Sequence, residues 1–261
     1  MVLLPHVPSV ESSGPVLGTV RFVAELGWLG YVRHGESTGN LAAARAEADG
    51  LEVIDIPERD ADVPLSETGR EQAAAVSRWF ADNPPDLVVC SPYLRTVQTA
   101  ELAVGDTGVR IVRDERLRDR ELGILDLLTR KGVQVRHPTE FERRKRLGHF
   151  YYRPPGGESW ADVTLRLRAA LGDLRRDYAD QRVLVVAHEV TVYLLRYLLE
   201  HLTEAEMLAL IKPNLVRNCA ISTWHRTDGG TLEIVDFNKV DHLHREGTEP
   251  TREAGLHGEP V

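Results

Sequence analysis

Strand-like and helix-like patterns alternate along most of the chain, and no other feature of the sequence restricts its fold as strongly. Short apolar runs with the composition of buried strands occur in "GWLGYVRHG", "DLVVCSP" and "RVLVVAHE". Each run is followed by a segment whose composition favours a helix. This order predicts an α/β fold, namely a three-layer α/β/α sandwich whose central sheet is mostly parallel.

Helix and turn signals between the strands support this fold class. The segment "PLSETGREQAAAVSRWFADNPP" is expected to form a helix that Ser66 caps and that Pro84 and Pro85 terminate. In "GGESWADVTLRLRAALGDLRRDYAD" apolar residues recur at helical spacing, which predicts a long amphipathic helix. The last two strand patterns, "NCAISTWHR" and "TLEIVDFNKV", predict a hairpin that turns at 228–230.

The chain length and the distribution of polar residues predict one large domain with loose ends. The chain has 261 residues, of which 42% are hydrophobic, enough for one substantial core. We expect a flexible arm at 1–17, the α/β domain at 18–243 and a disordered polar tail at 244–261. Within the domain, a helical and basic insert is expected at about 123–155.

The composition argues against several classes of partner and cofactor. The formal net charge of −8 is not that of a nucleic-acid-binding surface. No segment has the length of a membrane span and the N-terminus is a poor signal peptide, so a cytoplasmic protein with no membrane partner is expected. Cys90 and Cys219 lie in apolar surroundings, as reduced core residues do, and no metal or cofactor spacing is found. A homodimer is one candidate assembly.

Charged and imidazole side chains follow the strand patterns and suggest a binding site. Arg33 and His34 follow the first run, Arg95 lies just after the second, and His188 ends the third. Because ligands of parallel α/β sheets bind outside the carboxyl ends of the strands, these four groups are expected to meet at one edge. Two arginines suit phosphate oxygens, and a neutral histidine can act as a nucleophile. The pattern indicates phosphoryl transfer.

An ordered set of motifs resembles the histidine phosphatase superfamily, the clan of phosphoglycerate mutases and related phosphatases. The motifs are "RHGES", "DVPLSETGREQA", "CSPYLRTVQTA", "PPGGES" and "VVAHEVT". The resemblance implies that His34 is phosphorylated on a ring nitrogen and then hydrolysed without a metal. It also implies that Arg33, Arg95 and His188 complete the phosphate pocket and that Asn40 contacts the substrate phosphate. Taken singly, each of these residues is more often a structural or surface residue.

The proton donor for the leaving oxygen is less well defined by the sequence. The resemblance implies a glutamate four residues before a glycine. In "LRDRELG" the residue four positions before Gly123 is Asp119. Glu121 is the alternative donor and is otherwise expected to contact the substrate, and both residues also fit a solvated, salt-bridged charge run. A second departure from the family is Glu189, which stands where a glycine is usual after the late histidine. It points away from the pocket, or it faces inward, where it repels anions or selects substrates that carry a positive group. Nearby Thr191 is expected to offer a hydroxyl to the substrate.

Three functions are compatible with these motifs. The favoured one is a metal-independent phosphomonoesterase, an acid phosphatase type that acts on a small phosphorylated metabolite. The second is a phosphoglycerate-type mutase, which the sequence disfavours because "FYYRPPGGES" lacks the long triple-proline insert of that branch. The third is a phospho-ligand binding protein without turnover, which Asp119 and Glu189 suggest. The basic run "RRKR" at 143–146 is either a helix face or a lid that meets a second anionic group.

Overall fold

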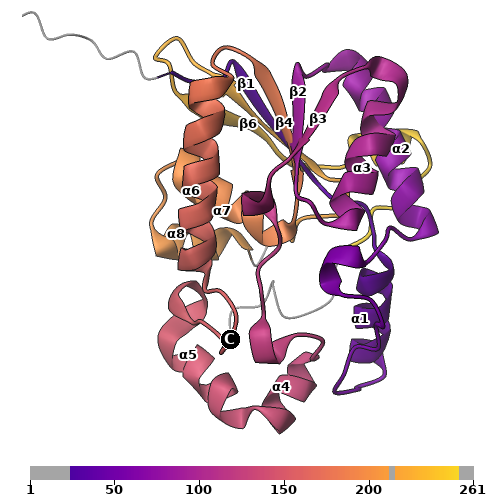
Figure 1. Ribbon diagram of the computed structural model, residues 1–261, viewed down its shortest axis with the longest axis vertical. Coiled ribbons are helices and arrows are strands. Elements are labelled where there is room, and N and C mark those ends of the chain that lie inside the picture. The colour runs from indigo at the N-terminus through magenta and orange to yellow at the C-terminus, as the bar shows by residue number, and fades with distance from the viewer. Residues whose placement is uncertain (1–23, 212–214, 253–261) are drawn as a thin grey trace, which may run out of the picture.

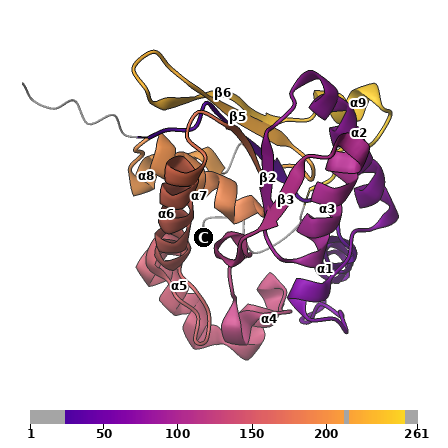
Figure 2. The same ribbon diagram turned by 45° about the horizontal axis from the view of Figure 1, so that its top comes forward.

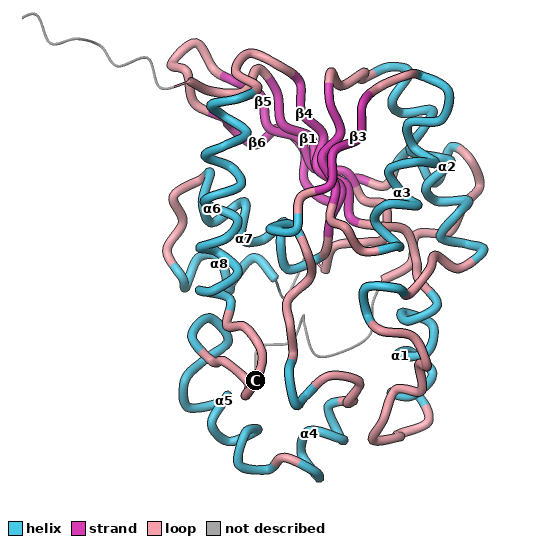
Figure 3. Tube along the Cα trace, viewed as in Figure 1, coloured by secondary structure: helices cyan, strands magenta, loops and turns pink. Residues whose placement is uncertain are grey.

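Six strands form one sheet in the computed structural model, which describes residues 24–211 and 215–252. The strand order is β3-β2-β4-β1-β5-β6 (Figures 1 and 3). The first four strands in the chain pair in parallel and the last two are antiparallel. Their bounds are β1 (Trp28–Arg33), β2 (Leu87–Cys90), β3 (Arg110–Arg113), β4 (Arg182–Ala187), β5 (Ile221–Arg226) and β6 (Leu232–Lys239). The predicted mostly parallel sheet is confirmed.

Helices cover both faces of the sheet, which confirms the predicted three layers (Figure 1). One face is packed by α6 (Trp160–Asp177), α7 (Glu189–Leu199) and α8 (Glu204–Ile211). The other is packed by α2 (Glu67–Asp82), α3 (Leu94–Val104) and the short α9 (Asp241–Arg245), which lies beside α2 (Figure 2). None of the helices in the described residues is long and apolar enough to cross a membrane.

The strands read as continuous apolar runs because the two faces of the sheet bury alternate residues. In β1, Leu29 and Tyr31 enter the core beneath α6 and α7, whereas Trp28 and Val32 enter the core beneath α2 and α3. The predicted helix signals also hold: Ser66 caps α2 by accepting a 2.9 Å hydrogen bond from the Gly69 amide. The hydrophobic face of α6 is buried as its spacing predicts.

Short helices at the carboxyl ends of the parallel strands form a third region (Figure 1). They are α1 (Thr38–Ala48), α4 (Arg130–Arg136), α5 (Pro138–Tyr151) and the 3₁₀ turns η1 (Asp60–Asp62), η3 (Glu115–Leu117) and η4 (Gly123–Leu125), whereas the 3₁₀ turn η2 (Gly105–Thr107) joins α3 to the amino end of β3. Leu125, Leu128, Val133 and Tyr152 form a small core of their own here. The basic run of α5 is a helix face: Arg143 and Lys145 pair with glutamates of the same helix, and Arg144 is buried beside His149.

The predicted C-terminal tail begins later than its composition suggests. Residues 244–252 lie in α9 and in a segment that is hydrogen-bonded to the domain. The Gln72 side chain donates to the Glu249 carbonyl at 2.9 Å, and the Asn218 amide donates to the Thr251 carbonyl at 2.9 Å. The expectation of disorder from 244 is therefore wrong for 244–252, because the Gln72 side chain and the Asn218 backbone N–H of the domain bind this segment. The predicted arm at 1–17 and the end of the tail lie outside the described residues.

Candidate active site

The four groups predicted from the strand ends meet at one edge of the sheet. His34 directly follows β1 and His188 directly follows β4, and these strands are paired neighbours in which Arg33 faces Ala187. The two imidazole rings have centroids 5.3 Å apart. Arg95 lies in the first turn of α3, which follows β2, and its side chain reaches the same edge. The parallel sheet accounts for this meeting, as expected from the sequence.

His34 is held as a neutral imidazole with one nitrogen engaged. Its Nδ1 lies 2.7 Å from the carbonyl oxygen of Gly35. Because that carbonyl can only accept, Nδ1 carries the proton and the lone pair is on Nε2. Burial, and then the positive charges of Arg95 and Arg33, hold the pKa of His34 well below its ordinary value. The arrangement leaves an unprotonated ring nitrogen for nucleophilic attack.

Backbone hydrogen bonds fix the loop that carries His34. The Gly35 amide donates to Thr99 Oγ1 at 3.0 Å, and the Glu36 amide donates to Gln72 Oε1 at 2.9 Å. The Asn218 side chain donates to the His34 carbonyl at 3.1 Å. A Cβ on Gly35 would lie 2.4 Å from the Gly69 carbonyl, so this position requires glycine. Gln72 and Asn218 are positioning residues to which the sequence assigned no role, although Gln72 lies in the motif "DVPLSETGREQA".

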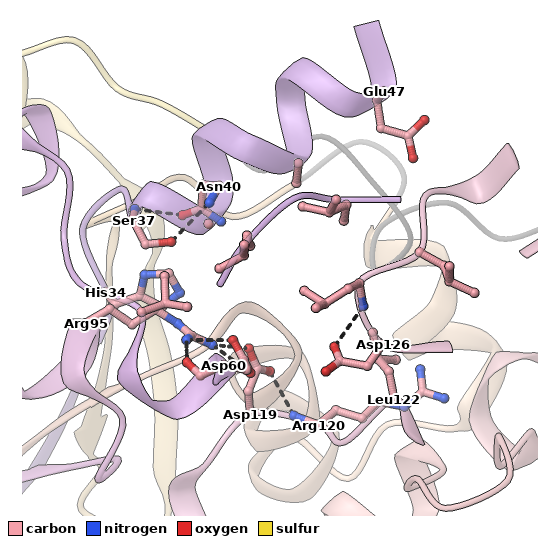
Figure 4. Close-up of a pocket in the computed structure, with 17 residues that line it drawn as sticks. His34, Ser37, Asn40, Glu47, Asp60, Arg95, Asp119, Arg120, Leu122 and Asp126 are labelled. Carbon is pink, nitrogen blue, oxygen red and sulfur yellow. Dashed lines mark hydrogen bonds and ion pairs between the residues drawn. The ribbon is translucent and has the colours of Figure 1, made fainter. Parts of the chain in front are cut away.

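Asn40 lines the pocket and caps the helix that follows His34. Its Oδ1 accepts a 3.0 Å hydrogen bond from the Ser37 amide, and Ser37 Oγ accepts from the Asn40 amide at 3.1 Å. This reciprocal capping box fixes the carboxamide beside His34 (Figure 4). Its position is compatible with the predicted contact to a substrate phosphate.

Arg95 forms ion pairs with two carboxylates, those of Asp60 and Asp119. Its Nη1 donates to the Asp60 carbonyl at 2.6 Å and to Asp60 Oδ1 at 2.9 Å, and its Nη2 lies 3.1 Å from Asp119 Oδ2. Its side chain is 5% exposed, so these contacts fix the planar guanidinium at the pocket wall. Asp60 comes from η1 and was given no role by the sequence. It lies in a charged loop without periodicity, so no pattern marks it.

The two candidate proton donors point in different directions. Asp119 lines the pocket, and its Oδ2 lies 3.2 Å from His188 Nδ1 as well as next to Arg95 (Figure 4). Glu121 is exposed and its Oε1 accepts a 3.1 Å hydrogen bond from the Tyr93 hydroxyl. Glu121 is absent from the pocket lining, so the structure does not place it where it would contact a substrate, as the sequence predicted. The geometry favours Asp119 over Glu121 as the group that can reach a leaving oxygen.

His188 is fully buried behind the residues that line the pocket, and other buried side chains hold it there. Its Nε2 lies 2.9 Å from Ser91 Oγ, and the Tyr31 hydroxyl donates to its carbonyl at 2.5 Å. Thr191 Oγ1 donates to the same carbonyl at 2.6 Å and is fully buried. The Thr191 hydroxyl completes the helix cap and is absent from the pocket lining, so the geometry does not favour the predicted contact with substrate. Burial lowers the pKa of His188, although Asp119 opposes that shift.

Glu189 points away from the pocket. Its Oε2 lies 3.5 Å from Arg33 Nη1, and its Oε1 accepts a 3.1 Å hydrogen bond from the Val216 amide. Arg33 in turn donates to the Val216 carbonyl at 2.5 Å. Both side chains are buried. The carboxylate is thus a counter-ion behind Arg33. The sequence left open whether it faces the pocket, and in the observed orientation it does not repel an anion bound there.

We expect Glu189→Gln to reduce activity rather than raise it. The amide keeps the hydrogen bond to Val216 but loses the charge that stabilises the buried Arg33, and breaking a buried pair costs about 3 kcal/mol. A lower melting temperature and a kcat/KM for an aryl phosphate reduced by about tenfold are expected, from thermal unfolding and steady-state kinetics. Glu200→Gln removes a carboxylate from the ion pair with Arg196, at the end of the same helix, and is the control. An increase in activity would contradict this orientation.

The described residues contain no group of three or more His, Cys, Asp and Glu side chains arranged to hold a metal ion. The pocket that starts at His34 and Arg95 has a volume of about 830 Å³, including space open to solvent. It is lined by α1, by the loop at 54–63 and by residues 119–128, and so only partly by the predicted insert. None of the basic residues at 143–146, all of which the structure describes, lies in this lining.

Several known proteins are similar to this chain in sequence and in fold. A protein of Yersinia enterocolitica named probable phosphoglycerate mutase GpmB is 30% identical over 229 residues, covering 82% of this chain and 97% of that protein. The structure of YhfR from Bacillus stearothermophilus has a TM-score of 0.66 and 25% identity, covering 83% of this chain and 98% of that chain. The mycobacterial glucosyl-3-phosphoglycerate phosphatase Rv2419c, solved with inorganic phosphate, has a TM-score of 0.63 and 25% identity, covering 82% and 98%.

The family model described as histidine phosphatase superfamily (branch 1) matches residues 29–239. This range includes all six strands apart from Trp28 of β1, both histidines at the strand ends, and Arg33 and Arg95. The sequence motifs, the arrangement of the sheet and the family model therefore indicate the same family. The chain belongs to branch 1 of the histidine phosphatase superfamily.

Proposed function

We propose that this protein is a phosphatase that hydrolyses phosphate monoesters through a phosphohistidine on His34. The observation that carries the proposal is the buried, neutral His34 with Nδ1 bound to the Gly35 carbonyl, next to Arg95, His188 and Asp119. A nucleophile, cationic groups and a carboxylic acid are the components that transfer to a histidine requires. The likeness to a solved mycobacterial phosphatase supports this reading.

In the first step, Nε2 of His34 attacks phosphorus in line with the ester oxygen. The N–P bond forms as the P–O bond breaks, and Asp119 gives its proton to the departing alkoxide. Arg33, Arg95 and His188 stabilise the charge on the three equatorial oxygens. In the second step, Asp119 removes a proton from water, the water oxygen attacks phosphorus, and the N–P bond breaks. Inorganic phosphate and the neutral alcohol are released.

A mutase is the second candidate, because relatives named phosphoglycerate mutase cover most of the chain. A mutase must hold a polyanionic bisphosphate and return the phosphoryl group to a second hydroxyl. The pocket beyond His34 carries Glu47 and Asp126 rather than a further cluster of cations. This charge distribution favours hydrolysis of a monoester over transfer between anionic intermediates.

Phosphate release from para-nitrophenyl phosphate in excess EDTA tests the proposal. We expect turnover that EDTA leaves unchanged and that a bisphosphoglycerate primer does not increase. Interconversion of phosphoglycerates that rises with the primer, together with weak phosphate release, would instead identify a mutase. Saturable binding of phosphate esters without any release would identify a binding protein.

A further inference from the structure

The pocket that begins at His34 has an apolar wall beyond the phosphate groups. Residues 53–54 and 127–128 pair through a backbone bridge and a 2.8 Å hydrogen bond from the Ile54 amide to the Leu127 carbonyl. The side chains on this wall are aliphatic: Ala43, Ile54, Ile56, Val63, Leu122, Leu127 and Leu128. A concave, largely aliphatic surface is the usual binding site of an apolar group.

The charges around this wall are mostly negative. Among the described residues that line the pocket, Glu47, Asp60 and Asp126 carry carboxylates besides the proposed proton donor Asp119, against the guanidinium groups of Arg95, which pairs with Asp60, and Arg120. Figure 4 shows Glu47 and Asp126 at the end of the pocket opposite His34. A ligand that lies on His34 and extends along the wall therefore approaches two carboxylates with its far end.

Arg120 does not offset these carboxylates as an exposed cation would. Its side chain is buried, its Nε donates to the Glu158 carbonyl at 2.7 Å, and its Nη2 donates to the Tyr152 carbonyl at 3.4 Å. Burial lowers its pKa to about 10, so it stays charged at neutral pH. Its donors are directed at backbone carbonyls of the segment between α5 and α6, which is a structural use of the charge.

We propose that the substrate is a phosphate monoester of an apolar alcohol that carries no second anionic group. This inference rests on the proposed phosphatase function and concerns the alcohol rather than the chemistry. The phosphate lies on His34 and Arg95, and the carbon chain lies along the aliphatic wall. A carboxylate or second phosphate at the far end meets the half-buried Glu47, where like charges repel more strongly than in water. Asp126 is exposed, so solvent screens its contribution to this repulsion.

Three primary alkyl phosphates separate the length of the chain from the charge at its far end. n-Hexyl phosphate, ethyl phosphate and 6-phosphonooxyhexanoate have the same type of ester bond, so the chemical step is matched. Each methylene that is fully buried is worth about fourfold in binding. We expect kcat/KM for the hexyl ester to exceed that of the ethyl ester, and that of the terminal carboxylate, by at least about tenfold each. Equal or better hydrolysis of either of the other two would overturn the proposal.

Glu47→Gln tests whether this carboxylate causes the discrimination. Glu47 Oε1 accepts a 2.9 Å hydrogen bond from the Arg130 amide, and glutamine can keep it. The ratio of kcat/KM between the hexyl ester and its carboxylate analogue should fall severalfold in this variant. Glu142→Gln removes an exposed carboxylate of α5 that pairs with Lys145 outside the pocket, and the ratio should stay unchanged. An unchanged ratio in Glu47→Gln would remove this residue from the proposal.

Binding measurements keep a failure of this inference distinct from a failure of the proposed function. If none of the three esters is hydrolysed, the phosphatase proposal fails, yet the pocket can still be tested. Calorimetric titration with hexylphosphonic acid and 6-phosphonohexanoic acid then compares the same two chain ends without turnover. Tighter binding of hexylphosphonic acid supports the inferred ligand class. Tighter or equal binding of 6-phosphonohexanoic acid overturns it.

Discussion

Phosphate release by His34→Gln is expected to be about 10⁴-fold slower than by the wild-type protein, or slower still, because the variant has no nucleophile. Glutamine is similar in size and leaves the surrounding hydrogen bonds to Thr99, Gln72 and Asn218 in place, so the fold should be kept. The measurement is steady-state release from an aryl phosphate, with circular dichroism to check the fold. His244→Gln, which alters an exposed histidine outside the pocket, is the matched control.

Trapping the intermediate makes the same prediction more specific. Wild-type protein that is denatured during turnover should carry an acid-labile phosphoryl group on the peptide that contains His34, detected by mass spectrometry. The label should be absent from His34→Gln and present in His244→Gln. Substantial turnover by His34→Gln, or a phosphoryl group found on another residue, would show that the reaction does not proceed through His34.

The lowered pKa of His34 gives this variant a further expected property. In the unfolded chain an ordinary histidine takes up a proton near pH 6.5, whereas the folded His34 stays neutral well below that value. The stability that depends on the neutral form is therefore complete above about pH 6.5 and is lost as the pH falls towards the folded pKa. His34→Gln should lose less of its melting temperature than the wild type between pH 7.5 and 5. A larger loss would contradict a neutral, buried His34.

Asp119→Asn is expected to separate substrates by their leaving groups. An alkoxide must be protonated as it departs, so hydrolysis of an alkyl phosphate should fall by about 10²- to 10⁴-fold. A nitrophenolate leaves without a proton, so hydrolysis of its ester should change by less than about tenfold. Asparagine can still accept hydrogen bonds from Arg95 and His188, which limits the damage to the pocket. The measurement is kcat for the two esters under the same conditions.

Glu121→Gln is the matched variant for this experiment. It removes a solvent-exposed carboxylate, two residues after Asp119, that contacts the Tyr93 hydroxyl. We expect it to affect both esters equally and little. If Asp119→Asn hydrolyses the alkyl ester at the wild-type rate while Glu121→Gln does not, the proton donor is Glu121 and the loop at 117–123 moves during turnover.

The sequence alone determined the elements and the edge of the sheet at which the site lies. Continuous apolar runs mark strands that are buried on both faces, and apolar spacing of about 3.6 residues marks helices, and a chain displays both patterns without its partners. Parallel pairing then brings the carboxyl ends of β1, β2 and β4 to one edge, so Arg33, His34, Arg95 and His188 are predictable although they are distant in sequence.

Only the tertiary structure decided which charged residues contact one another. Asp60 on Arg95, Glu189 behind Arg33 and the hydrogen bonds of 249–251 to the domain all join segments that lie far apart in the chain. Such residues lie in loops or at helix ends, where no periodicity marks their direction. Because a carboxylate can pair with any cation within reach, its role depends on distances that the folded chain alone sets.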